Sequence, residues 1–360
     1  MPDFIDYSMY KQWNFCKWSY YERYVLRRQK KWPATMRDDA LAIGSLVHSG
    51  LEGWYKNGTI EIPRDVIEKL NPTPETLRLT QGLVFGYVQT YPKEQWEFIR
   101  CEAPIRFNLI SGRNGLAKID MYFYIPERTT IESGVAGYEI TLNPGWWIQE
   151  YKTKSPHVDQ AEWMRSWTTN MQADFQMLAL REFIYANNHL PGEHDKVNGL
   201  LINIIEKPKD YIPKRKCPEC EVYWNYSAWQ PQSGGMFKCP NGHEKKLKPL
   251  DTQKDAPQAR YFRMMVERTP EQLECAKEQI KHIAFEMQAL EDSHNKAGGN
   301  ILLGEIGGFY PPNREHCLNL GARYARECEY FRPHTYGSST IGNEEYQDTE
   351  DYIGETSLVG

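Results

Sequence analysis

Two closely spaced pairs of metal-ligating residues constrain this chain more than any other feature of its sequence. Cys217 and Cys220 form a C-x2-C pair, and after eighteen intervening residues Cys239 and His243 form a C-x3-H pair. Each pair fits a tight turn, so the four side chains can reach one tetrahedral Zn²⁺. The segment between them is too short for a packed core, and metal binding must supply much of its stability. The pattern predicts a zinc ribbon.

The segments around this ribbon have the patterning of an α/β protein. Apolar periodicity predicts helices over 7–28, 39–55, 73–91, 159–187 and 270–292. Alternating or continuous apolar runs predict strands over 98–109, 116–125, 146–151, 197–205 and 259–266. The ribbon falls between two of these strands. We therefore expect a mixed central sheet flanked by helices, with the ribbon inserted near the far edge of the sheet.

This patterning divides the chain into four parts. Residues 1–206 hold the N-terminal helices and most of the α/β core, 207–249 the ribbon, 250–336 the rest of the core with a cysteine-containing segment, and 337–360 an acidic tail. The tail contains six acidic residues and no Lys or Arg, so we expect it to be disordered. The whole chain has a net charge of −5, but without these six residues it has 43 basic and 42 acidic residues and is nearly neutral. Its charge therefore does not exclude a nucleic-acid partner.

The chain has no run of about 18 apolar residues, so no membrane span is expected. Residues 1–10 lack the basic and apolar regions of a secretory signal. These features predict a cytoplasmic protein, in which clustered cysteines bind metal rather than form disulfides. Cys101 and Cys275 stand alone on a predicted strand and helix, and we interpret both as buried structural residues.

A second group of residues suits metal-assisted chemistry on a phosphate. Asp120 ends an apolar stretch, and Glu150 and Lys152 follow on a later strand. Because side chains alternate along a strand, Glu150 and Lys152 point to the same face. Two carboxylates would hold Mg²⁺ or Mn²⁺, which prefer oxygen ligands. The lysine would orient a metal-activated water or stabilise developing negative charge.

An isolated E-x-K pattern is common, but here it stands in an ordered set. The set comprises Cys16 within an aromatic and basic helix, the G-x-x-x-H motif Gly44–His48, the hairpin motif Gly115–Asp120, the E-x-K-T motif Glu150–Thr153, and Gln172–Gln176, which has Gln where Q-x-x-x-Y is usual. In these motifs the chain resembles the RecB-like branch of the PD-(D/E)XK nuclease superfamily, which includes phage exonucleases and CRISPR-adaptation nucleases. The resemblance spans roughly residues 7–206 and resumes at 259–334.

The resemblance implies a restriction-endonuclease-like core and a role for each motif residue. His48, Asp120 and Glu150 would be the metal ligands, Lys152 would be catalytic, and Gln172 would position the nucleic acid or the lysine. It also implies a DNA exonuclease of recombination, repair or phage DNA processing in a bacterial or phage-infected cell. Whether the substrate is single- or double-stranded DNA stays open, and so does whether a recombination or replication protein is a partner. The alternatives are a structure-specific endonuclease or nickase, and a non-catalytic zinc-ribbon protein that binds nucleic acid.

A further metal centre is implied by the same resemblance. Many RecB-like nucleases carry a 4Fe–4S cluster held by one cysteine before the core and three after it. Cys16, Cys317 and Cys328 fit three of these positions, and His334 stands where the last cysteine is usual. Zinc would accept this Cys₃His set as readily as a cluster would. A site that has lost its metal is the third alternative.

Overall fold

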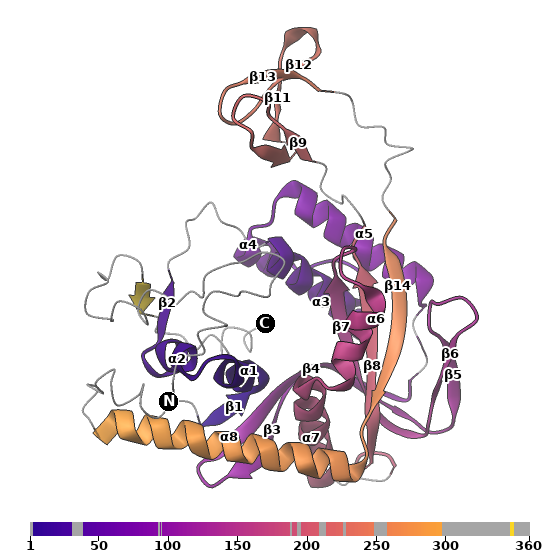
Figure 1. The fold of residues 1–360 in the computed structure, drawn as a ribbon. Coiled ribbons are helices and arrows are strands. Elements are labelled where there is room, and N and C mark those ends of the chain that lie inside the picture. The colour runs from indigo at the N-terminus through magenta and orange to yellow at the C-terminus, as the bar shows by residue number, and fades with distance from the viewer. Residues whose placement is uncertain are drawn as a thin grey trace.

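The computed structural model of the chain describes residues 3–30, 39–92, 94, 96–187, 189–192, 196–208, 214–225, 228–247, 258–296 and 346–348. Its centre is a mixed α/β body in which helices flank a six-stranded sheet (Figure 1). The strands are β1 (Phe4–Asp6), β3 (Phe98–Ile110), β4 (Arg113–Ile125), β7 (Gly145–Lys154), β8 (Val197–Glu206) and β14 (Arg260–Glu267). The expected fold class, a mixed central sheet flanked by helices, is confirmed.

The order of the strands explains why the sheet is mixed. They run β1-β4-β7-β8-β14, with β3 paired to β4 as well. The pairs β1–β4 and β7–β8 are parallel, whereas β3–β4, β4–β7 and β8–β14 are antiparallel. The parallel pair β7–β8 needs a long crossover, which two helices supply. They are α6 (Gln160–Thr168) and α7 (Met171–Ala186).

Two predicted helices are interrupted in the structure. Residues 159–187 form α6 and α7 rather than one helix, because the Asn170 side chain caps α7 by accepting the Gln172 N–H at 2.9 Å. Residues 7–28 form α1 (Tyr7–Phe15), α2 (Lys17–Tyr20) and a π-helical turn (Tyr21–Val25). The break between α1 and α2 lies at Cys16, whose backbone is extended with φ −163°.

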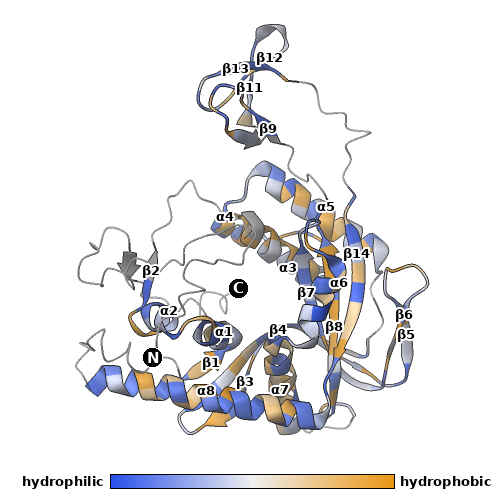
Figure 2. Ribbon diagram, viewed as in Figure 1, coloured by the Kyte–Doolittle hydropathy of each residue, from blue (hydrophilic) through white to orange (hydrophobic). Residues whose placement is uncertain are grey.

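Helices cover both faces of the sheet and form two buried cores. On one face α1, α7 and α8 (Pro270–Lys296) pack on the sheet, and on the other α3 (Asp39–Asn57) and α5 (Pro74–Thr90) do so. A short helix α4 (Arg64–Leu70) and a hairpin of β5 (Thr129–Glu132) and β6 (Glu139–Leu142) were not predicted. Figure 2 shows apolar residues gathered on the sheet and on the helix sides that face it. β8 lies between the two cores and is buried along almost its whole length.

A buried ion pair ties the long helix α8 to the sheet. The guanidinium of Arg113 on β4 contacts the Glu291 carboxylate on α8, and both side chains are almost wholly buried. The Tyr20 hydroxyl donates a hydrogen bond to the same carboxylate at 2.9 Å. This contact joins α2, β4 and α8, so three segments far apart in sequence meet at one charge.

The predicted ribbon segment forms a small unit of its own that stands apart from the α/β body in Figure 1. A hairpin pairs β9 (Lys214–Lys216) with β10 (Tyr223–Asn225). A second sheet has the order β11 (Gln230–Pro231), β12 (Met236–Lys238) and β13 (Glu244–Lys246). Its core contains Cys217, Trp229, Cys239 and Leu247. The strands are too short to bury more than this, as expected of a unit held together by metal.

The N- and C-terminal segments also meet. Strand β2 (Arg28–Lys30) pairs antiparallel with β15 (Tyr346–Asp348). These three residues belong to the acidic tail that was expected to be disordered, and the rest of that tail lies outside the described residues. Among the helices that the structure describes, none is long and apolar enough to cross a membrane.

Candidate active site and metal centre

The predicted carboxylates meet where β4 and β7 stop pairing. The paired stretch of β4 begins at Met121, opposite Gln149, so Asp120 and Glu150 lie side by side just beyond it. Beyond this point the Tyr151 N–H donates to the Asp120 side chain, at 3.0 Å from Oδ2, instead of to a backbone carbonyl of β4. Two carboxylates from different parts of the sequence therefore lie side by side where the backbone pairing of β4 and β7 ends.

A histidine from the opposite helix completes this group. His48 lies on α3, which packs on β7, and its Nδ1 is 3.1 Å from Asp120 Oδ1. The ring of Tyr151 meets the His48 ring edge-on, with centroids 6.1 Å apart. About a quarter of the His48 side chain is exposed, so the imidazole is accessible from outside. The G-x-x-x-H motif thus brings its histidine to the predicted partner.

The other carboxylate, Glu150, is held on all sides. Lys152, two residues along the same strand, places its Nζ 2.5 Å from Glu150 Oε1. Gln172 donates to Oε1 at 2.8 Å, and Gln176 donates to Oε2 at 2.7 Å. Both glutamines lie on α7, one turn apart, where their side chains share a face. The structure therefore brings Asp120, Glu150, Lys152, His48 and Gln172 into one cluster.

Gln176 was noted in the sequence only as a departure from the usual tyrosine. Its amide nitrogen also donates to the Lys118 carbonyl at 3.1 Å, so it links α7 to β4 as well as to Glu150. The residue is 2% exposed. Its spacing of four from Gln172 was the available signal, since it puts both amides over the same strand.

Charges in this cluster bias one another. Burial raises the pKa of Asp120, but the nearby His48 and Lys152 and the Tyr151 N–H outweigh it and hold that pKa at about 2. Burial and the Asp120 charge raise the pKa of Glu150 above its usual value, despite the Lys152 ammonium. Burial lowers the pKa of His48, yet the Asp120 carboxylate more than compensates and raises it. Two repelling carboxylates beside an imidazole form a donor set that a divalent cation would stabilise.

The Lys152 ammonium lies between the Glu150 carboxylate and the ring of Trp167. Its ammonium lies 5.4 Å from the centre of the Trp167 ring, close enough for a cation–π contact. Burial lowers the pKa of Lys152, but the carboxylates of Glu150 and Asp120 outweigh burial and raise it, so the side chain stays charged. About a quarter of the side chain is exposed. A charged, partly accessible lysine of this kind can meet an incoming anion.

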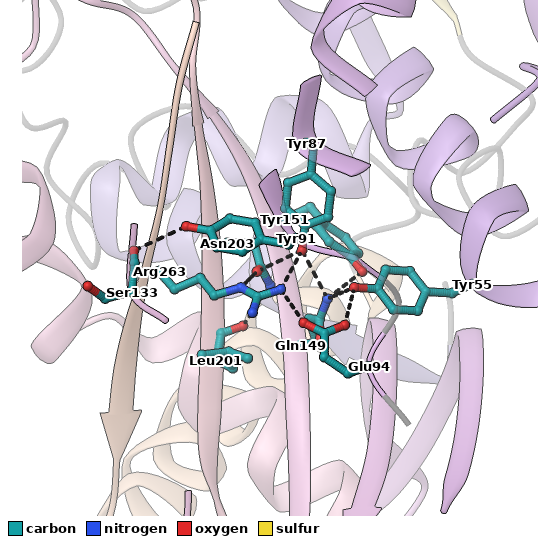
Figure 3. A network of polar contacts seen from close by, with 10 residues as sticks. All are labelled: Tyr55, Tyr87, Tyr91, Glu94, Ser133, Gln149, Tyr151, Leu201, Asn203 and Arg263. Carbon is teal, nitrogen blue, oxygen red and sulfur yellow. Dashed lines mark hydrogen bonds and ion pairs between the residues drawn. The ribbon is translucent and has the colours of Figure 1, made fainter. Parts of the chain in front are cut away.

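The opposite face of β7 carries a buried polar network that supports the site (Figure 3). Gln149, next to Glu150, donates to the Tyr151 hydroxyl at 2.6 Å and to the Tyr55 hydroxyl at 3.2 Å. Tyr55 in turn donates to Glu94 at 2.9 Å, and the Arg263 guanidinium contacts that carboxylate. The remaining members are Tyr87, Tyr91, Ser133, Leu201 and Asn203. The network joins α3, α5, β7, β8 and β14, and so fixes the strand from which Glu150 and Lys152 project.

The four predicted zinc ligands of the ribbon converge. One donor atom each from Cys217, Cys220, Cys239 and His243 lies within 4.8 Å of the others. His243 Nδ1 is 3.8 Å from the Cys217 sulfur and 3.6 Å from the Cys239 sulfur. Tetrahedral zinc with bonds of about 2.0–2.3 Å requires ligand–ligand separations of roughly 3.5–3.8 Å. The cluster has a donor set that could hold a metal ion such as zinc, and the two separations from His243 match that geometry.

Backbone N–H groups favour the thiolate forms of Cys220 and Cys239, whereas burial raises the pKa of Cys217. Burial raises the pKa of the Cys220 thiol, but the Val222 N–H and the facing His243 and Cys217 bring it down to about 6. The turn after Cys239 is closed by a hydrogen bond from Gly242 N to the Cys239 carbonyl at 2.8 Å. Gly242 has φ 91°, a conformation that favours glycine. A lowered thiol pKa provides the deprotonated ligand that a metal requires.

Only one member of the predicted N- and C-terminal metal centre lies in the described part of the chain. Cys16 is buried between α1 and α2. Cys317, Cys328 and His334 lie outside the described residues. Of the two cysteines interpreted as structural, Cys101 is buried, whereas Cys275 is exposed. That second interpretation is wrong because Cys275 falls on the outer side of the amphipathic helix α8.

No protein-family model and no curated protein matches the chain. Among solved structures, the chain is similar to a crystal structure from Eubacterium rectale that is provisionally named an exonuclease. The two share 14% sequence identity over 93% of this chain and 94% of that chain, with a TM-score of 0.39. A score of this size does not establish a shared fold, so the chemistry of the site is judged from its own geometry.

Proposed function

We propose that this protein is a divalent-metal-dependent deoxyribonuclease that hydrolyses phosphodiester bonds at the His48–Asp120–Glu150–Lys152 cluster. The observation that carries the proposal is the meeting of two carboxylates from different strands with a lysine paired to one and a histidine to the other. Asp120 and Glu150, with His48, have the hard oxygen and nitrogen donors that suit Mg²⁺ or Mn²⁺.

Each residue has a distinct task in this scheme. When bound, the metal ion polarises a phosphoryl oxygen and lowers the pKa of a water molecule. Lys152 orients the attacking water and stabilises the negative charge that develops on the phosphate. The water oxygen bonds to phosphorus and gives up a proton to solvent as the bond to the leaving sugar oxygen breaks, and that oxygen takes up a proton from solvent. Gln172 and Gln176 hold both Glu150 oxygens, which fixes the carboxylate toward the metal position.

The choice among nucleases rests on the sequence resemblance, which favours an exonuclease of recombination, repair or phage DNA processing, working with a recombination or replication protein. An endonuclease or nickase would use the same four residues. A non-catalytic binding protein has no need for a lysine paired to one of two adjacent carboxylates. The charge arrangement at Glu150 and Lys152 therefore favours an enzyme.

Cleavage of end-labelled single- and double-stranded DNA, with and without Mn²⁺, tests the proposal. Asp120→Asn and Lys152→Ala should each lower the rate by about 100-fold or more. Asp65→Asn, which removes an acid from the first turn of α4, is the matched control and should cleave like wild type. Undiminished cleavage by the purified Lys152→Ala protein would rule out this site.

Two further substrates separate the alternatives. An exonuclease leaves covalently closed circular DNA intact, whereas an endonuclease or nickase opens it. RNA of the same sequence as the DNA tests the choice of sugar. Binding without cleavage on every substrate would favour the non-catalytic protein.

We also propose zinc at Cys217, Cys220, Cys239 and His243, and a second metal centre to which Cys16 contributes with Cys317, Cys328 and His334. A 4Fe–4S cluster would make anaerobically purified protein brown, with iron in the metal analysis. Zinc at both sites would leave it colourless with about two zinc ions per chain. One zinc and no iron would exclude metal at the second centre.

A further inference from the structure

Positive charge is concentrated on the zinc ribbon. Its described residues include six basic side chains and three acidic ones, a net charge of +3. Since the whole chain carries −5, the remainder carries −8. Six of these eight negative charges belong to residues 337–360, so the α/β body is only weakly acidic, and a polyanion is attracted to the ribbon. The basic residues are Lys214, Arg215, Lys216, Lys238, Lys245 and Lys246.

One face of the β9–β10 hairpin combines this charge with an exposed aromatic ring. Arg215 pairs across the hairpin with Trp224, and Lys216 pairs with Tyr223. Trp224 packs against the ribbon core. Side chains alternate along a strand, so Lys216 and Tyr223 lie on the face away from that core. Both are exposed, and Tyr223 retains 64% of its accessible surface.

A second ammonium group lies beside this face. Lys245 Nζ donates a hydrogen bond to the backbone carbonyl of Lys216 at 3.0 Å. This contact holds Lys245 next to the strand that carries Lys216. Glu221 lies 3.6 Å from the Lys216 ammonium, but both side chains are substantially exposed, so the pair is weak and easily exchanged for a phosphate.

We propose that Tyr223, Lys216 and Lys245 form a contact site for single-stranded nucleic acid, with the ring stacked on an unpaired base and the ammonium groups paired to phosphates. An aromatic platform beside basic side chains is the combination that binds single strands without sequence preference. Duplex DNA offers no free base face to Tyr223. This inference rests on the proposed function. A strand held by the ribbon would have a raised local concentration at Asp120 and Glu150, where cleavage is proposed to occur.

Fluorescence anisotropy with a labelled oligothymidylate of about 15 nucleotides tests this site, using the full chain without added Mg²⁺ or Mn²⁺ and without chelator. Tyr223→Ala should weaken binding about tenfold, while Tyr223→Phe keeps the ring and should bind like wild type. Lys216→Ala with Lys245→Ala should make the plot of log affinity against log salt shallower by about 1.4, as expected for two lost phosphate contacts.

The matched control is Arg64→Ala with Lys69→Ala on α4, which removes two charges from the α/β body and should leave affinity nearly unchanged. Zinc content equal to wild type shows that each ribbon variant is folded. Equal affinity of wild type and Tyr223→Ala, or equal loss of duplex and single-strand binding, would overturn the proposal. Wild-type protein that binds the oligonucleotide but never cleaves DNA would refute the nuclease and not this site.

Discussion

The Gln176 amide donates to Glu150 Oε2 at 2.7 Å, and thereby occupies the carboxylate oxygen that the neighbouring Gln172 does not reach. Helix α7 consequently holds both oxygens of Glu150 from one side, while Lys152 meets the carboxylate from its own strand. Glu150 is 1% exposed, so its orientation is set almost wholly by these three side chains.

Gln176→Leu should therefore weaken metal binding, although Gln176 itself is buried and is not a proposed metal ligand. Loss of a hydrogen bond that orients a metal-ligating carboxylate typically costs about 10- to 100-fold in metal affinity or activity. We expect the Mn²⁺ concentration for half-maximal cleavage to rise by a factor in this range. Gln288→Leu on α8, whose amide bonds only to the exposed Asp292 among the described residues, is the control. An unchanged Mn²⁺ requirement in Gln176→Leu would show that Glu150 is oriented without it.

Cys239→Ser should remove one zinc ion per chain and unfold the ribbon. The ribbon core has too few apolar residues to stay folded without metal, whereas the α/β body has cores of its own. Metal analysis and limited proteolysis should show zinc loss with cleavage confined to the ribbon. Cys275→Ser, at an exposed cysteine outside the cluster, should keep its zinc. Equal zinc content in the two variants would contradict the assignment.

Arg113→Met should destabilise the protein by about 3–5 kcal/mol, because it leaves the Glu291 carboxylate buried without its cation. Adding Glu291→Gln should recover part of this loss, since the neutral amide costs less to bury. Urea unfolding of the single and double variants measures both effects. A double variant no more stable than Arg113→Met would show that the buried charge is not the cause.

Glu206 should contribute to the pH dependence of stability. Burial tends to raise its pKa, but hydrogen bonds from Lys154 at 2.7 Å and from Arg260 outweigh burial and lower it below the usual 4.5. A lowered carboxyl pKa stabilises the folded state above the unfolded value, and this stability is lost as pH falls through the folded value. The unfolding temperature of Glu206→Gln should lie below that of wild type at pH 7, and the gap should close below pH 4.5. A difference in unfolding temperature that did not change with pH would show that ionisation of Glu206 does not cause it.

The sequence by itself determined most of the long strands and helices and pointed to the candidate residues of both sites. Apolar periodicity predicted the strands 98–109, 116–125 and 197–205 and the helix that starts after Thr269, because burial on one or both faces imposes a local repeat. The spacing of Cys217, Cys220, Cys239 and His243 determined their convergence, since each pair lies on one turn. These are short-range properties that a one-dimensional pattern can contain.

Only the tertiary structure decided how distant residues share a function. The contact between His48 and Asp120 depends on α3 packing on β7, and the contacts of Gln176 depend on α7 packing on β4. The pairing of Arg113 with Glu291 joins residues 178 positions apart, and nothing local marks either as a partner. The exposure of Tyr223 beside Lys216 depends on which hairpin face packs on the ribbon core. Such relationships arise from packing between elements, because the sequence specifies each surface but not which surface it will meet.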